Sequence, residues 1–264
     1  MNEFIEKAKL IKDDIISYRR TIHSNPEVGP NLPKTKAYVM DKLKELGYDP
    51  KEICESGIVA TIEGRKTGKT FLLRADMDAL PMAEATECDF KSTNGCMHSC
   101  GHDMHTAMLL GAARLLKENQ DEIEGTIGSL NKEIGEFIFD RMNDIVISTA
   151  KMFRGEAELI ELSSVPPLAN DTDLAKEITS YIKDLLGEKS VHLFEGGGMG
   201  SEDFASYSYE VPSVYLMLGA GTKQENTLYG EPMHNKNIVI NEDTLITEAA
   251  MHTYCAIMWL KNNK

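Results

Sequence analysis

The feature that most constrains the fold is a short Cys and His cluster placed directly before a long apolar helix. The cluster reads MHSCGHDMH and covers residues 97–105. Residues 103–118 then carry apolar side chains at helical spacing, which predicts a largely buried helix. Before the cluster, the apolar run from Thr70 to Asp76 predicts a central strand buried on both faces. Strand, polar loop and helix in this order are typical of an α/β fold, which gathers its ligands at the carboxyl ends of the strands.

The rest of the chain continues this alternation. Apolar spacing predicts helices over residues 3–22, 33–46, 172–187 and 242–260, and strands over residues 57–63 and 211–218, the last of them buried. The middle of the chain differs, because Thr126 to Leu130, about 131–153 and Ala157 to Leu162 predict a strand, a helix and a strand. That unit is too small to fold alone.

Charge and cysteine content exclude several classes of protein. The chain has 42 Asp and Glu against 28 Lys and Arg, a formal net charge of −14 that excludes a basic nucleic-acid surface. No apolar run is long enough to span a bilayer, and the first residues lack the apolar region of a signal peptide, so we expect a cytoplasmic protein. Five cysteines without a C-x-x-C spacing do not suggest a disulfide framework.

The cluster itself contains candidate metal ligands. Cys100 and His102 are separated by one glycine, so both side chains can point at one ion, and a thiolate with an imidazole suits zinc, manganese, cobalt or nickel. The start of a helix also lowers the pKa of a thiol and favours the thiolate. His98 and His105, taken alone, are predicted to be ordinary hydrogen-bonded residues.

Two carboxylates, Asp76 and Asp78, follow the predicted central strand. Carboxylates at this place can bind a metal or hold a ligand His in the required tautomer. A helix cap or turn before Pro81 is an equally good interpretation of Asp76, whereas for Asp78 we favour a functional role.

Two further segments are weaker candidates. The glycine loop at residues 196–204 matches neither G-x-G-x-x-G after a strand nor a P-loop, so it gives no support for a nucleotide site. Its backbone amides could bind a substrate carboxylate, which makes Gly200, Ser201 and Glu202 candidate substrate-binding residues. A flexible connection is the alternative. His234, a single loop histidine near the end, is weak evidence when taken alone.

Taken together, the motifs resemble the amidohydrolase branch of the dinuclear metallopeptidases, which includes hippurate hydrolases, N-acyl-amino-acid deacylases, N-acetyldiaminopimelate deacetylases and auxin-conjugate hydrolases. The resemblance covers residues 14–125 and 163–264. It is carried in order by DIISYRRTIHSNPEVG, LLRADMDALPM, MHSCGHDMHTAMLLGAARLL, PPLANDTDL, GGGMGSEDFASY and MHNKNIVINEDTL. It implies an α/β fold with a mixed, mostly parallel sheet and helices on both faces, plus a small remnant of an α+β lid domain.

The resemblance also implies roles for individual residues. Cys100, His102 and His234 match ligands of divalent metals, with manganese, zinc, cobalt or nickel as one or two ions, and Asp78 matches the residue that supports the site. Asp76 and His105 are then possible surrogate ligands or supports. The family's general base and a neighbouring ligand lie in a QPAEE-like motif, followed by another ligand His. All three should come soon after Gly125, and none is present.

A central block therefore looks deleted. The resemblance implies a discontinuous catalytic domain at 1–125 and 163–264, with a truncated lid or dimerisation domain at 126–162. It predicts a metal-dependent amidohydrolase that cleaves N-acyl amino acids by metal-activated water, impaired by loss of the general base and of two metal ligands. The alternatives are an inactive relative that at most binds metal or ligand, and a structural-metal or thiol-redox protein. Expected partners are a small-molecule substrate and, through the lid remnant, a second copy in a homodimer, but neither nucleic acid nor membrane.

Overall fold

The computed structural model describes residues 3–53, 55–127, 166–194 and 202–263. The chain divides into two compact units. Unit 1 comprises Met1–Ser129, Tyr181–Ser190 and Met217–Lys264, and unit 2 comprises Leu130–Ser180 and Val191–Leu216.

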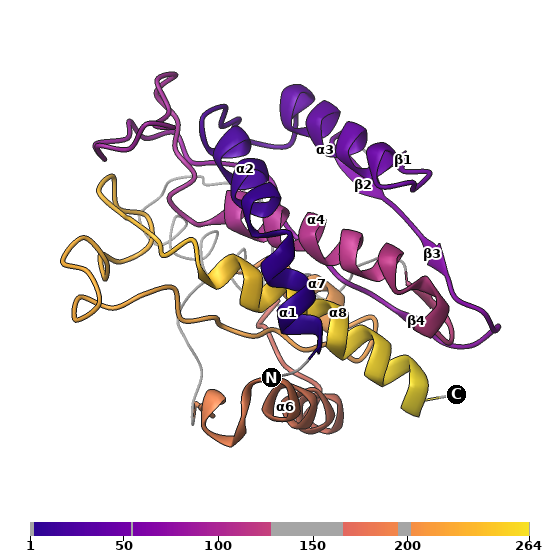
Figure 1. Cartoon of the computed structure of the whole chain (residues 1–264). Helices are drawn as coiled ribbons and strands as arrows, with labels where there is room; N and C mark the ends of the chain where they lie inside the picture. Colours follow the sequence, from indigo (N-terminus) through magenta and orange to yellow (C-terminus); the bar gives the residue numbers. More distant parts are fainter. Residues whose placement is uncertain (1–2, 54, 128–165, 195–201, 264) are drawn as a thin grey trace, which may run out of the picture. The chain divides into compact units, whose positions relative to one another are not determined.

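The described elements are mainly helices, with short strands in the first half of the chain (Figure 1). The helices are α1 (Glu3–Leu10), α2 (Lys12–His23), α3 (Pro33–Glu45), α4 (His102–Glu118), α6 (Thr172–Leu186), α7 (Ala205–Ser208) and α8 (Thr244–Asn262), with 3-10 turns η1 (Gln120–Glu122) and η2 (Glu188–Ser190). The strands are β1 (Lys51–Ile53), β2 (Gly57–Val59), β3 (Ile62–Glu63), β4 (Thr70–Phe71) and β5 (Thr126–Ile127).

The strands of unit 1 form two small sheets. Strands β1 and β2 pair antiparallel, with Glu52 opposite Ile58. In the second sheet β5 lies in the middle, antiparallel to β3 and parallel to β4, so that Ile127 lies opposite both Ile62 and Phe71. The predicted α/β class with a mixed sheet is thereby confirmed.

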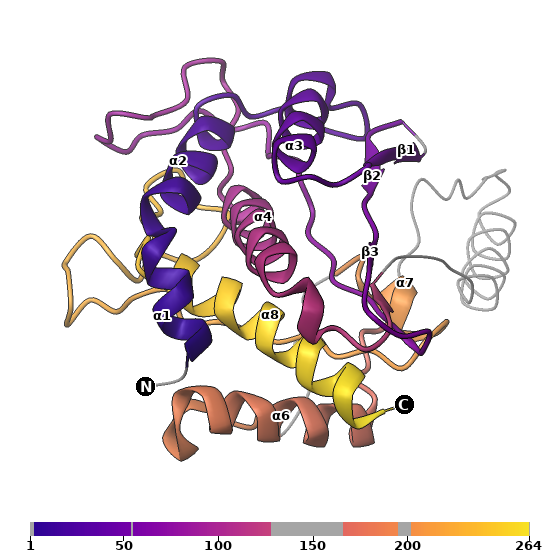
Figure 2. The same cartoon turned by 45° about the vertical axis from the view of Figure 1, so that its right-hand side comes forward.

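The core of unit 1 lies between helices rather than within the sheets. Helix α4 packs against α8 and α2, and α1 lies along α8 (Figures 1 and 2). A Cβ on Gly111 of α4 would approach the Ile15 side chain to 2.7 Å and Ala249 to 3.1 Å. A larger residue there would force α2 and α8 away from α4, since packed interiors leave no room for an added carbon.

The buried core side chains fit the predicted helical periods. Those of α4 and α8 with less than a tenth of their surface exposed include Met104, Ala107, Met108, Leu110, Ala112, Leu115, Leu116, Leu245, Ala249, Ala250, Ala256, Ile257 and Leu260. The predicted helices at 33–46, 103–118, 172–187 and 242–260 are present with bounds shifted by at most two residues. Within the described residues, no helix is long and apolar enough to cross a membrane.

Three predicted elements are shorter or interrupted. The helix predicted at residues 3–22 is two helices, because Ile11 between α1 and α2 has a non-helical ψ of 13°. The strand predicted at 57–63 is divided into β2 and β3. The strand predicted from Thr70 to Asp76 is assigned only at Thr70–Phe71 and is not buried on both faces. Farther along, the Asp76 carbonyl accepts the Thr106 hydroxyl instead of a strand partner, at 2.8 Å.

The buried strand predicted at residues 211–218 is wrong, since the structure describes this segment and assigns no strand to it. The Asn170 side chain occupies the place of a strand neighbour: its amide nitrogen donates to the Tyr215 carbonyl at 3.0 Å, and its oxygen accepts the Tyr215 N–H at 2.7 Å. Val211 is 44% exposed, so the segment is also not a buried one. Most of the predicted lid remnant, from residue 128 to 162, lies outside the described residues.

Candidate metal centre

The first turn of α4 positions the Cys and His cluster of unit 1. Gly101 has a φ of +87°, a left-handed conformation that side-chain-bearing residues rarely adopt. Its carbonyl accepts the N–H groups of Met104 at 2.9 Å and His105 at 3.1 Å, which begins the helix. The chain therefore turns sharply between Cys100 and His102, and both side chains lie at the helix start.

His102 is held through one ring nitrogen. Its Nδ1 lies 2.9 Å from the carbonyl oxygen of Asp78 and 2.9 Å from that residue's Oδ1. Both neighbours of Nδ1 are acceptors, so Nδ1 carries a proton, and Nε2 is the nitrogen that remains for a metal or a second proton. Nε2 faces the carboxylate of Asp76, whose Oδ2 is 3.5 Å away.

Asp76 is the point at which three candidate donors meet. Its Oδ1 lies 2.7 Å from Nδ1 of His105, and its Oδ2 accepts a hydrogen bond from Arg74 at 3.0 Å. One donor atom each from Asp76, His102 and His105 lie within 4.8 Å of one another. The predicted alternative for Asp76, a helix cap or turn residue, does not describe these contacts.

His234 joins the cluster from a loop far along the chain. Its backbone N–H donates to the Ser99 carbonyl at 2.9 Å, and its Nε2 lies 3.4 Å from Cys100 Sγ. His234 has a φ of 64°, which is uncommon for a residue with a side chain. Such conformations cost of order 1–3 kcal/mol and concentrate at functional sites.

The electrostatics of the cluster fit a cation. Burial alone would lower the pKa of His102, but hydrogen bonds to Asp78 and Cys100 and the charge of Asp76 raise it to about 11. Burial would raise the pKa of Asp76, yet His105, His102 and Arg74 hold it well below its usual value. An imidazole surrounded by anionic groups to this extent lies where a divalent ion would bind favourably. Thiol, imidazole and carboxylate donors are also the ligands that zinc prefers.

The predicted substrate-binding residues are placed only in part. Gly200 and Ser201 lie outside the described residues. Glu202 belongs to unit 2, where its carboxylate accepts the N–H of Phe204 at 3.0 Å, just before α7.

A buried network on the other side of the α4 start was not predicted from the sequence. Asp103, which is fully buried, accepts a hydrogen bond from Arg19 Nε at 2.8 Å and lies 2.8 Å from His23 Nδ1. His23 Nε2 in turn lies 3.1 Å from Glu84. Burial would lower the pKa of His23, but Asp103 and Glu84 raise it. The helical i,i+4 spacing of Arg19 and His23 was the available signal.

His98 also differs from its prediction as a hydrogen-bonded residue. It is 2% exposed, and neither ring nitrogen has a hydrogen-bond partner among the described residues. Desolvation lowers its pKa, so the buried ring is neutral.

Comparison with known sequences identifies the family. The profile of peptidase family M20/M25/M40 matches residues 72–132 and 124–257, more than half of the chain. The chain belongs to this family. The two matches share residues 124–132.

Curated relatives match over part of their length. The N-acyl-L-amino acid amidohydrolase of Geobacillus stearothermophilus is 40% identical over 119 residues, which are 44% of this chain and 32% of the relative. Thermostable carboxypeptidase 2 of Saccharolobus solfataricus is 48% identical over 46% of this chain and 31% of its own. IAA-amino acid hydrolase ILR1-like 5 of Arabidopsis thaliana is 44% identical over 44% of this chain and 27% of the relative. The chain thus spans about a third of these relatives.

A solved M20 structure has the same fold. The YXEP protein of Bacillus subtilis, described as a dinuclear metal binding peptidase from the M20 family, superposes with a TM-score of 0.79 at 20% identity. The superposition covers 96% of this chain and 99% of the other.

Proposed function

We propose that this M20 chain is a metal-dependent amidohydrolase that cleaves the amide bond of N-acyl amino acids. Two contacts at the α4 start carry the proposal: Nε2 of His234, from a distant loop, lies 3.4 Å from Sγ of Cys100. Nε2 of His102 lies 3.5 Å from the carboxylate of Asp76. Relatives named as an N-acyl-L-amino acid amidohydrolase and an IAA-amino acid hydrolase support this substrate class.

Cys100 Sγ, His102 Nε2 and His234 Nε2 are the protein atoms that would hold the metal, as manganese, zinc, cobalt or nickel. A bound divalent ion supplies Lewis-acid activation of water and of the amide carbonyl. Asp78 keeps the His102 ring oriented through Nδ1, at 2.9 Å. Asp76 and His105, whose side chains are 2.7 Å apart, add a carboxylate and an imidazole beside His102. In this proposal the pair takes up the proton of the attacking water.

The proposal extends to domain organisation and assembly. Residues 1–125 and 163–264 would form the catalytic domain, and 126–162 would be what is left of the lid. The glycine loop with Gly200, Ser201 and Glu202 would bind the substrate carboxylate. The lid remnant could pair with a second copy to form a homodimer.

A second function is favoured by one sequence observation. The chain contains no pair of adjacent glutamates anywhere, so it lacks the general base that the amidohydrolase resemblance implies. Removing a general base typically costs two to four orders of magnitude in rate. The second candidate is therefore a family member that binds metal and an N-acyl amino acid without turnover.

Metal content and hydrolysis measured together separate the two candidates. The protein is loaded with zinc or manganese, dialysed and analysed for metal per chain, then assayed on N-acetyl amino acids and hippurate with and without chelator. The variant Cys100→Ala removes a proposed ligand. The matched control is Cys96→Ala, a half-buried free thiol four residues earlier.

The amidohydrolase proposal expects chelator-sensitive product formation that Cys100→Ala abolishes and Cys96→Ala keeps. Metal bound through Cys100, with substrate-induced thermal stabilisation but no product, would select the second candidate. Both candidates would be contradicted if Cys100→Ala bound as much metal per chain as wild type and Cys96→Ala.

A further inference from the structure

We propose that the chain has a second metal site of the zinc class, formed by His23 Nε2, a Glu84 carboxylate oxygen and Cys88 Sγ. One donor atom from each residue lies within 4.8 Å of the other two. His23 and Glu84 are buried and Cys88 is half-buried. The site uses none of Cys100, His102 or His234, so it is independent of the proposed hydrolase function.

The spacing of the donors matches a tetrahedral zinc site. Zinc bonds of about 2.0–2.1 Å to nitrogen or oxygen and about 2.3 Å to sulfur place tetrahedral N and O ligands roughly 3.3 Å apart, and sulfur roughly 3.6 Å from either. His23 Nε2 lies 3.1 and 3.2 Å from the two oxygens of Glu84. Cys88 Sγ lies 3.7 Å from Glu84 Oε1. These values match two edges of such a tetrahedron, and the third donor pair, His23 and Cys88, lies within 4.8 Å.

Two of the three ligands, His23 and Glu84, are also held in place by hydrogen bonds from behind. Asp103 lies 2.8 Å from Nδ1 of His23, the carboxylate–histidine arrangement that orients imidazole ligands in zinc sites. Glu84 accepts the backbone N–H of Ser92 at 2.8 Å and a hydrogen bond from the hydroxyl of Thr86. Two carboxylate oxygens offer about four acceptor positions, so these bonds leave room for a metal.

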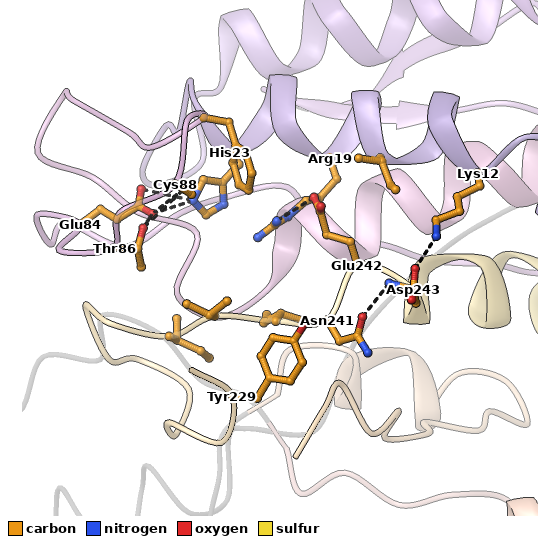
Figure 3. Close-up of a pocket in the computed structure, with 15 residues that line it drawn as sticks. Lys12, Arg19, His23, Glu84, Thr86, Cys88, Tyr229, Asn241, Glu242 and Asp243 are labelled. Carbon is orange, nitrogen blue, oxygen red and sulfur yellow. Dashed lines mark hydrogen bonds and ion pairs between the residues drawn. The ribbon is translucent and has the colours of Figure 1, made fainter. Parts of the chain in front are cut away.

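The three donors border an open cavity, which allows a fourth ligand. The cavity has a volume of about 410 Å³, and its lining includes His23, Glu84, Thr86 and Cys88. Figure 3 shows these four side chains together at one end and Lys12 and Asp243 at the other. Three protein ligands with an open fourth position are typical of a zinc site that binds water or a small molecule.

The charge of Arg19, which also lines this cavity, is already compensated. Its Nε donates to Asp103 at 2.8 Å, and its Nη1 donates to Glu242 at 3.0 Å. His23 lies between Asp103 at Nδ1 and Glu84 at Nε2, so an ion bound at Nε2 would stand beside the Glu84 carboxylate, which can compensate its charge. Binding would also release the thiol proton of Cys88.

Cobalt(II) absorption tests the site in the full-length chain. In the Cys100→Ser variant the thiolate of the first centre is removed, so any thiolate-to-cobalt charge-transfer band must come from another cysteine. We expect this band to be present, to be lost in Cys100→Ser/Cys88→Ser, and to be kept in Cys100→Ser/Cys96→Ser. Zinc should displace the cobalt and remove the band.

A second measurement leaves the first centre intact. Elemental analysis of zinc-loaded wild type and Cys88→Ser should differ by one ion per chain, with Cys96→Ser equal to wild type. Circular dichroism without metal confirms that the variants are folded. The proposal is overturned if Cys100→Ser shows no charge-transfer band, if Cys88→Ser leaves that band unchanged, or if Cys88→Ser binds as much zinc as wild type.

Discussion

Two faces of the α4 start carry two different polar clusters, one partly exposed and one buried. His102 and His105 lie on one face beside Asp76, and their ring centroids are 5.5 Å apart. Asp103, between them in sequence, faces α2 and contacts Arg19 and His23. Consecutive helical residues point about 100° apart, so a single turn can serve both clusters.

The two clusters differ in exposure. The Asp78 side chain is 43% exposed, whereas that of Asp103 is fully buried. Water can reach the first cluster and supply missing ligands, so its donors can keep open positions. The second can retain its charges only by pairing them. We therefore expect loss of Asp78 to act mainly on metal binding at the first centre, and loss of the buried Asp103 to act mainly on stability.

The largest expected effect is on stability, from Asp103→Asn. This substitution leaves Arg19 buried beside a neutral amide, and breaking a buried ion pair typically costs about 3–5 kcal/mol. Urea unfolding would measure the loss. The control is Asp173→Asn, whose side chain is 94% exposed and pairs with Lys176. Equal losses in the two variants would contradict the comparison.

A smaller effect is expected from Asp78→Asn, which removes the carboxylate that orients His102 at 2.9 Å. Loss of such an orienting group typically weakens metal binding about 10–100-fold. Competition with a chelator in the Cys88→Ser background would measure zinc at the first centre. Unfolding without metal should be nearly unchanged. The exposed Asp41→Asn on α3 is the control, and equal zinc affinity in the two variants would count against the orienting role.

Gly101→Ala separates backbone strain from ligand placement. Gly101 has a φ of +87° and Gly29, the control position, a φ of +81°. A Cβ added at either glycine would meet no atom closer than 3.8 Å. Both alanine variants should lose about 1–2 kcal/mol of stability through the left-handed backbone alone. Gly101→Ala should in addition weaken metal binding, because a changed backbone at residue 101 alters the orientation of the Cys100 side chain relative to that of His102. Equal metal affinity in both variants would show that Gly101 does not position the ligands.

The smallest effect concerns Glu242, which lines the cavity beside the buried cluster. Burial would raise its pKa, but hydrogen bonds from Arg20 and Arg19 lower it. A lowered pKa stabilises the fold fully above the unfolded value of about 4.3 and loses this contribution as the pH falls through the folded value. Glu242→Gln should therefore cost about 1 kcal/mol near neutral pH and progressively less in acid. A cost that does not change with pH would contradict this assignment.

The sequence by itself determined features that depend on neighbouring residues. Periodic apolar side chains located α3, α4, α6 and α8, because burial of one helix face repeats every few residues. The single glycine between Cys100 and His102 likewise predicted two donors at one place. The α/β class followed from the order of these local patterns.

Only the tertiary structure decided which distant residues meet. His234 reaches Cys100 across 134 positions, and Asp103 meets His23 across 80. The strand predicted at 211–218 failed for the same reason, since the Asn170 side chain takes the hydrogen bonds that a neighbouring strand would have made. Local periodicity reports which face of a segment is apolar. It carries no information on the partner that covers that face, because long-range pairing depends on how the whole chain packs.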